Sequence, residues 1–89
     1  MSPEAFLERV ADLAGRAGLP GIGAGILVAA DAGEATDSRT FARLLGVAHA
    51  LVLRDCVALE EAGLITVERR DARTHRLFYS LTPAGRALL

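Results

Sequence analysis

The sequence has no lysine, no tryptophan and only one cysteine, Cys56, among its 89 residues. A single cysteine excludes an intrachain disulfide. With His49 and His75 as the only histidines, no group of cysteines and histidines has the spacing of a zinc site. The sequence therefore predicts no metal and no cofactor, and its cysteine content is typical of a reducing, cytoplasmic setting.

Long hydrophobic runs are also missing. The most apolar stretch, residues 19–30, is about half of the roughly 20 residues that a membrane-spanning helix needs. The first residues lack the basic segment of a secretory signal. We therefore expect no membrane segment and a single small domain. A chain of this size buries little more than about 60% of its unfolded surface, so we also expect self-association.

The charged residues are unevenly distributed along the chain. All ten basic residues are arginines, and the net charge is −1. Residues 1–38 hold two arginines and six acidic residues, whereas residues 39–76 hold seven arginines and five acidic residues. The positive excess of the second segment is more informative than the net charge of the chain.

Capping residues and hydrophobic periodicity predict a series of short helices. Ser2 before Pro3 is a helix start, because the hydroxyl can accept a bond from a free N–H and proline has no N–H to lose. Asp37 or Ser38 can cap a later helix in the same way. The predicted helices cover residues 3–17, 20–32, 39–45 and 48–62, followed by a short helix that begins at Thr82-Pro83.

The third and fourth predicted helices are joined by a tight turn at Gly46, which makes a helix-turn-helix. Two β-rich runs follow, at residues 64–68 and 77–81. The charged segment 69–76 separates them, so the runs predict a hairpin with a long basic tip. The element order indicates an α+β fold.

Four segments occur in a characteristic order and spacing. They are Phe41-Ala-Arg-Leu-Leu-Gly-Val-Ala48, Leu59-Glu-Glu-Ala-Gly-Leu-Ile65, Arg69-Arg-Asp-Ala-Arg73 and Ser80-Leu-Thr-Pro-Ala-Gly-Arg-Ala-Leu-Leu89. Together they resemble the winged helix-turn-helix of MarR-type bacterial transcription regulators, over about residues 20–89. The resemblance implies that the helix after the turn lies in the major groove of DNA and that the hairpin tip, the wing, reaches the minor groove. Residues 1–19 are then an N-terminal helix with a dimer contact.

The resemblance and the charge pattern predict the DNA contacts of a transcriptional regulator. At 100° per residue, Val52 and Cys56 face the core, whereas Ala50 and Arg54 face outward. Arg54 suits a guanine or a phosphate, and wing arginines suit a narrow minor groove. The predicted contact residues are Arg39, His49, Ala50, Arg54, Arg69, Arg70, Arg73 and Arg76. For His49, a phosphate contact and an ordinary surface position are equally compatible with the sequence.

Two apolar surfaces leave room for protein partners. Phe6, Val10 and Leu13 form a stripe on the first predicted helix, and we expect this stripe to be the interface of a homodimer. Leu51, Leu53 and Val57 on the outer side of the fourth predicted helix support an alternative function. In that alternative, the domain is a protein-interaction module that does not bind DNA.

Two further motifs have structural rather than chemical explanations. The glycine-rich run 21–25 does not follow a strand, as a dinucleotide-binding loop must, so we interpret its glycines as sites of close helix packing. Cys56 falls on the core face with no basic neighbour, which favours a buried side chain over a reactive thiol. No catalytic pairing of residues stands out, and we do not expect an enzyme.

Overall fold

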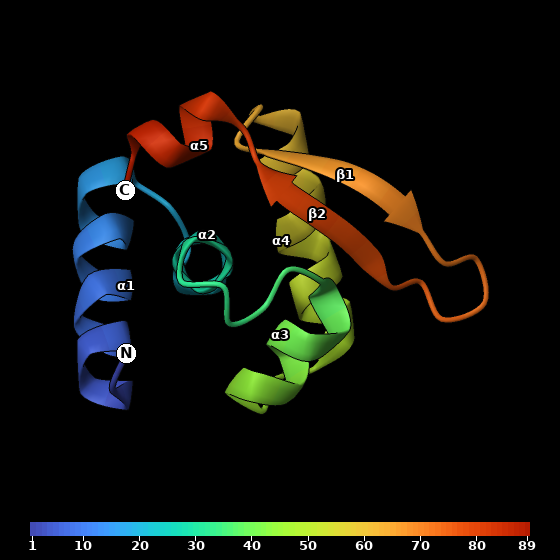
Figure 1. Cartoon of the computed structure of the whole chain (residues 1–89), viewed down its shortest axis with the longest axis horizontal. Coiled ribbons are helices and arrows are strands. Elements are labelled where there is room, and N and C mark those ends of the chain that lie inside the picture. The colour runs from blue at the N-terminus through green and yellow to red at the C-terminus, as the bar shows by residue number, and fades with distance from the viewer.

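The computed structural model describes residues 1–89 as five helices and a two-stranded antiparallel sheet (Figure 1). The elements are α1 (Pro3–Ala17), α2 (Gly21–Asp31), α3 (Ser38–Leu45), α4 (His49–Glu61), β1 (Ile65–Arg70), β2 (Leu77–Leu81) and α5 (Pro83–Ala87). This order confirms the predicted α+β winged helix-turn-helix. None of the helices is both long enough and apolar enough to cross a membrane.

The helix boundaries follow from local chemistry. The Ser2 hydroxyl accepts a hydrogen bond from the Ala5 N–H at 3.1 Å, which satisfies one of the free donors at the start of α1. Gly46 ends α3 with a φ of 66°, in the left-handed region that glycine adopts without steric cost. The same residue turns the chain toward α4, so the predicted helix-turn-helix geometry depends on it.

Helix α2 is the centre of the core. Figure 1 shows it end-on, with α1 on one side and α4 on the other. Every residue from 23 to 29 is buried, because this helix carries no charge before Asp31 and packs against neighbours on several faces. Leu13 from α1, Phe41 from α3 and Val52 from α4 are buried in the same cluster. Helix α1 therefore shares one core with the rest of the chain.

The position of α1 corrects one expectation. Phe6 and Leu13 were expected to need cover from a second subunit, but their side chains are only 8% and 0% exposed within the single chain. Val10 is half-buried against the same core. The apolar stripe of α1 thus packs against α2. The large apolar side chain of α1 that remains exposed is Leu7, at 60%.

The hairpin is longer at its outer end than predicted. Strand β1 continues to Arg70, where it pairs with Leu77, and the register shifts between Val67 and Arg69. This irregularity is a β-bulge, which bends the strand and increases its twist. The tip is closed by the Asp71 N–H, which donates to the Arg76 carbonyl at 2.9 Å. The wing extends away from the helices in Figure 1.

Candidate nucleic-acid interface

Helix α4 has the predicted orientation except at Leu53, which the sequence places on the outer face but which is half-buried against the core in the structure. Val52 and Cys56 are completely buried, whereas Ala50 and Arg54 are exposed. Burial raises the pKa of the Cys56 thiol to about 12, and the nearby carboxylates of Asp55 and Glu60 act in the same direction. Cys56 is therefore a protonated, buried side chain, and the outward face of α4 is left to other residues.

Arg54 is positioned by its neighbour Asp55. Its Nε donates to Asp55 Oδ1 at 3.3 Å, while the arginine side chain is 67% exposed and its terminal nitrogens make no hydrogen bond within the chain. The Asp55 carboxylate is buried, and its Oδ2 has no hydrogen-bond partner. The hydrogen bond to this buried acid holds the Nε end of the Arg54 guanidinium near the helix and leaves the two terminal nitrogens free for an external acceptor.

The four wing arginines have different environments. The Arg69 guanidinium lies 4.1 Å from the centre of the Phe78 ring, a cation–π distance. Arg70 donates to both carboxylate oxygens of Glu60 on α4, at 2.9 and 3.1 Å. Arg73, at the tip, is exposed and its guanidinium has no partner in the chain. Of these three, Arg73 is the one whose charge is least compensated.

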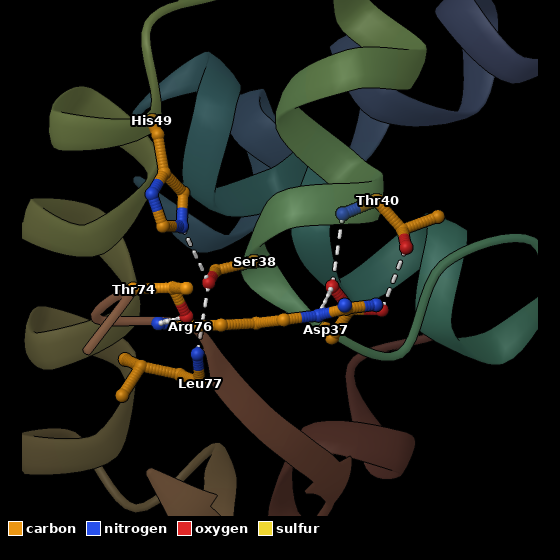
Figure 2. A network of polar contacts seen from close by, with 7 residues as sticks. All are labelled: Asp37, Ser38, Thr40, His49, Thr74, Arg76 and Leu77. Carbon is orange, nitrogen blue, oxygen red and sulfur yellow. Dashed lines mark hydrogen bonds and ion pairs between the residues drawn. The ribbon is translucent and has the colours of Figure 1, made fainter. Parts of the chain in front are cut away.

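Arg76 belongs to a polar network at the base of the wing (Figure 2). Its Nε donates to Asp37 Oδ2 at 2.8 Å, and its guanidinium also lies 4.8 Å from the Phe78 ring centre. Asp37 caps α3 by accepting hydrogen bonds from the Thr40 N–H at 2.9 Å and the Thr40 hydroxyl at 2.7 Å. Burial opposes ionisation of Asp37, but the hydrogen bonds from Arg76 and Thr40 outweigh it and lower its pKa to about 2.

Ser38 joins three elements at the centre of Figure 2. Its Oγ accepts a hydrogen bond from the Leu77 N–H of β2 at 3.0 Å and lies 2.8 Å from Nε2 of His49 at the start of α4. Burial lowers the pKa of His49, and the nearby charge of Arg39 adds to this effect. His49 is therefore neutral at pH 7.

This environment changes the interpretation of His49. The sequence left it equally suited to a phosphate contact and to a free surface position. In the structure it is half-buried and its Nε2 is occupied by Ser38. A neutral ring with one nitrogen engaged is a weak phosphate ligand, because it lacks the charge that makes such contacts strong. His49 is better described as part of the link between α4 and the wing.

Sequence reasoning missed several residues that shape this surface. Asp37 was recognised as a helix cap, but its partner Arg76 lies far away in sequence, and no local pattern indicates such a pairing. Phe78, whose ring contacts two guanidinium groups, has no distinguishing neighbour in the sequence either. Asp55 did have a signal, because it is three residues beyond the buried Val52 and so faces the core side of α4.

A second surface lies where α1, α2 and α3 meet. Two neighbouring grooves of about 350 and 300 Å³ share Phe6, Leu7 and Leu45 in their lining. Leu7 and Leu44 are more than half exposed there. Side chains of this size in solvent form an apolar surface on the helical side of the molecule.

A helix-turn-helix followed by an arginine-bearing hairpin is the architecture of winged-helix proteins. No family model and no curated protein matches this sequence. Among solved structures, the chain is similar to a MarR-family transcriptional regulator from Rhodococcus sp. RHA1, at 27% identity and a TM-score of 0.69. The match covers 96% of this chain and 60% of that one. The chain therefore has the MarR-type winged-helix fold, as the sequence motifs predicted.

The comparison also bears on the class of protein. The structural neighbour is a transcriptional regulator and does not come from a family of enzymes. The chain spans about 60% of the length of that regulator.

Proposed function

We propose that this protein is a DNA-binding transcriptional regulator. The observation that carries the proposal is the outward face of α4, where Arg54 presents free guanidinium nitrogens on a helix that follows a tight turn. A helix in this position is the one that enters the major groove in helix-turn-helix proteins. The fold shared with a MarR-family regulator supports the same function.

In this proposal, each part of the surface has a distinct role. Arg54 donates two hydrogen bonds to the O6 and N7 acceptors of a guanine edge, the commonest base-specific contact of arginine. Arg73 at the wing tip enters the minor groove, whose negative potential favours an uncompensated cation. Arg39, exposed in the first turn of α3, neutralises a phosphate.

The remaining wing arginines assist this arrangement. Arg69 stacks on Phe78 beside the wing tip, and its charge contacts the phosphate backbone of the DNA. Arg70 and Arg76 are held by Glu60 and Asp37, so they mainly fix the shape of the wing. Ala50 and His49 lie at the start of α4. Ala50 faces the bases, and His49 supports the helix through its hydrogen bond with Ser38.

The test is binding to duplex DNA, with a preferred site obtained by selection from a random library. Arg54→Ala should weaken binding to the selected site by about 1–3 kcal/mol and should change binding to random DNA much less, because a base contact discriminates between sequences. Arg86→Ala, which removes an exposed arginine from α5, is the matched control and should bind normally. Absence of duplex binding at low salt would contradict the proposal.

A second function is favoured by one observation. Leu51 and Val57 on the outer side of α4 are 41% and 42% exposed, which suits a protein-interaction module. If this module is the function, Arg54→Ala leaves weak DNA binding unchanged and Leu51→Asp abolishes association with the protein partner. Site-specific DNA binding that depends on Arg54 would exclude this alternative as the main function.

We also propose that the protein acts as a homodimer. Because Phe6 and Leu13 are internal, the contact is assigned to the apolar surface around Leu7, Leu44 and Leu45. A twofold dimer places two recognition helices on two half-sites, which increases affinity without new contacts at either one.

A further inference from the structure

The outward face of α4 has an unusual composition for a surface that reads bases. Ala50, Leu51 and Val57 are exposed apolar side chains on it, and Arg54 is its only long hydrogen-bond donor. Glu61 is the remaining exposed group with hydrogen-bonding capacity, and it lies at the last position of the helix. Apolar contact is therefore the main interaction that this face offers to a ligand.

The composition of the whole sequence limits which features of a base pair the protein can contact. It contains no asparagine and no glutamine, the two side chains that read adenine bidentately. An A·T pair exposes a second feature in the major groove, the 5-methyl group of thymine, and alanine and other apolar side chains contact that group. This chain consequently has the means to read A·T pairs through thymine but lacks the usual means to read them through adenine.

The spacing of the apolar groups along α4 also matches the spacing of stacked base pairs. With 100° per residue, Ala50, Arg54 and Val57 lie within one narrow stripe of α4, and Leu51 flanks it. With a rise of 1.5 Å per residue, Ala50 and Val57 are about 10 Å apart along the helix, on either side of Arg54. Base pairs stack about every 3.4 Å, so this length corresponds to roughly three base pairs.

We propose that α4 recognises thymine 5-methyl groups on both sides of a guanine that Arg54 reads. This inference deepens the proposed function and depends on it. The charge around the apolar groups favours DNA as the occupant of this face: the terminal nitrogens of Arg54 are free within it, and Arg39 and Arg73 are exposed on the adjoining helix and wing. A polyanion with methyl groups in its groove complements this mixture of cationic and apolar groups.

The experiment removes the methyl groups from the DNA. In the selected site, each thymine near the contacted guanine is replaced by deoxyuridine, which keeps every base-pairing and groove hydrogen bond. We expect about fourfold weaker binding for each contacted methyl group, from the ordinary effect of burying one such group. Thymines outside the α4 contact region serve as the control and should tolerate the change.

A protein variant then identifies the side chain involved. Val57→Ser removes both methyl groups of an exposed side chain and leaves a small hydroxyl in their place. This variant should bind the thymine site more weakly and should lose its sensitivity to deoxyuridine at one position, which is the sign of a direct contact. With the wild-type protein, a site in which cytosine replaces that thymine should bind weakly, and 5-methylcytosine at the same position should regain part of the affinity because it presents the same methyl group.

The outcomes separate this inference from the function on which it rests. If deoxyuridine changes nothing while Arg54→Ala still weakens site-specific binding, the regulator stands and methyl recognition is overturned. If deoxyuridine weakens binding equally at all positions, the effect arises from duplex shape, and the inference is again overturned. If the wild-type protein binds no duplex, both proposals fail together.

Discussion

The carboxylate of Asp37 and the guanidinium of Arg76 form an ion pair at 2.8 Å that joins the start of α3 to the base of the wing. One acidic side chain thereby caps a helix and anchors a hairpin. The aspartate of this pair is sheltered from solvent, because Asp37 is buried. Loss of this carboxylate affects both elements at once.

The first prediction concerns acid stability. The lowered pKa of Asp37, about 2 against an ordinary 3.8, means that the folded state binds this proton less readily than the unfolded chain. The stabilisation is therefore complete above about pH 5 and is lost as the pH falls toward 2. It amounts to about 2 kcal/mol. Denaturant unfolding between pH 7 and pH 2 measures it.

Substitution provides the control for this prediction. Asp37→Asn should lower the free energy of unfolding by about 2 kcal/mol at pH 7 and should flatten its dependence on pH. Asp12→Asn removes an exposed acid that pairs with Arg16 on the surface of α1, and it should cost at most about 1 kcal/mol. Equal effects of the two variants would show that Asp37 has no special role.

The second prediction concerns the salt dependence of DNA binding. Each phosphate contact that is lost should reduce the slope of log K against log salt by roughly 0.9. Arg73→Ala removes an uncompensated cation from the wing tip and should show this reduction. Arg70→Ala is the comparison, because Arg70 is already neutralised by Glu60, and its slope should stay close to that of the wild type. A larger reduction of the slope in Arg70→Ala than in Arg73→Ala would contradict the assigned roles.

The third prediction uses two glycines in helices. A Cβ at Gly25 would lie 3.0 Å from Cζ of Phe41, which is completely buried and has little room to move. Gly25→Ala should therefore destabilise the protein by about 1–3 kcal/mol. Gly15 on α1 has no atom within 4 Å of the same position, so Gly15→Ala should stabilise the protein by up to about 1 kcal/mol. Thermal unfolding distinguishes the two signs.

The fourth prediction concerns the dimer. Sedimentation equilibrium at micromolar concentrations should give twice the mass of the chain. Leu7→Glu and Leu45→Glu should each produce monomers, because they place a charge in an apolar contact. Leu51→Glu, on the outer side of α4 and outside the lining of both grooves, should remain dimeric. A wild-type protein that stays monomeric at high micromolar concentration would rule out this assembly.

The fold could be predicted from the sequence because its signals are local. Ser2, Gly46 and the apolar residues spaced three or four apart in α4 each act within a few positions, and the structure places the corresponding elements close to their predicted bounds. The glycine-rich run of α2 was also interpreted correctly at Gly25, where a side chain would press on Phe41. Gly21, by contrast, has open space around it and does not need to be glycine for packing.

The pairing of the charged side chains on the surface could not be predicted from the sequence. Whether an arginine is free or paired depends on residues that meet only after folding, as Arg70 meets Glu60 and Arg76 meets Asp37. The same limit applies to α1, because its periodicity shows that Phe6 and Leu13 are covered but does not show by what. In the structure the cover is α2 of the same chain.

The hydroxyl of Ser38 has a mechanical consequence. Since it contacts both the Leu77 amide and the His49 ring, the start of α4 and the base of the wing are tied to a single atom. Under the proposed function, the protein therefore fixes the spacing between α4 in the major groove and the wing in the minor groove. A duplex that engages both has to adjust its own groove width and curvature, so flexible base steps outside any direct contact should affect which sites are occupied.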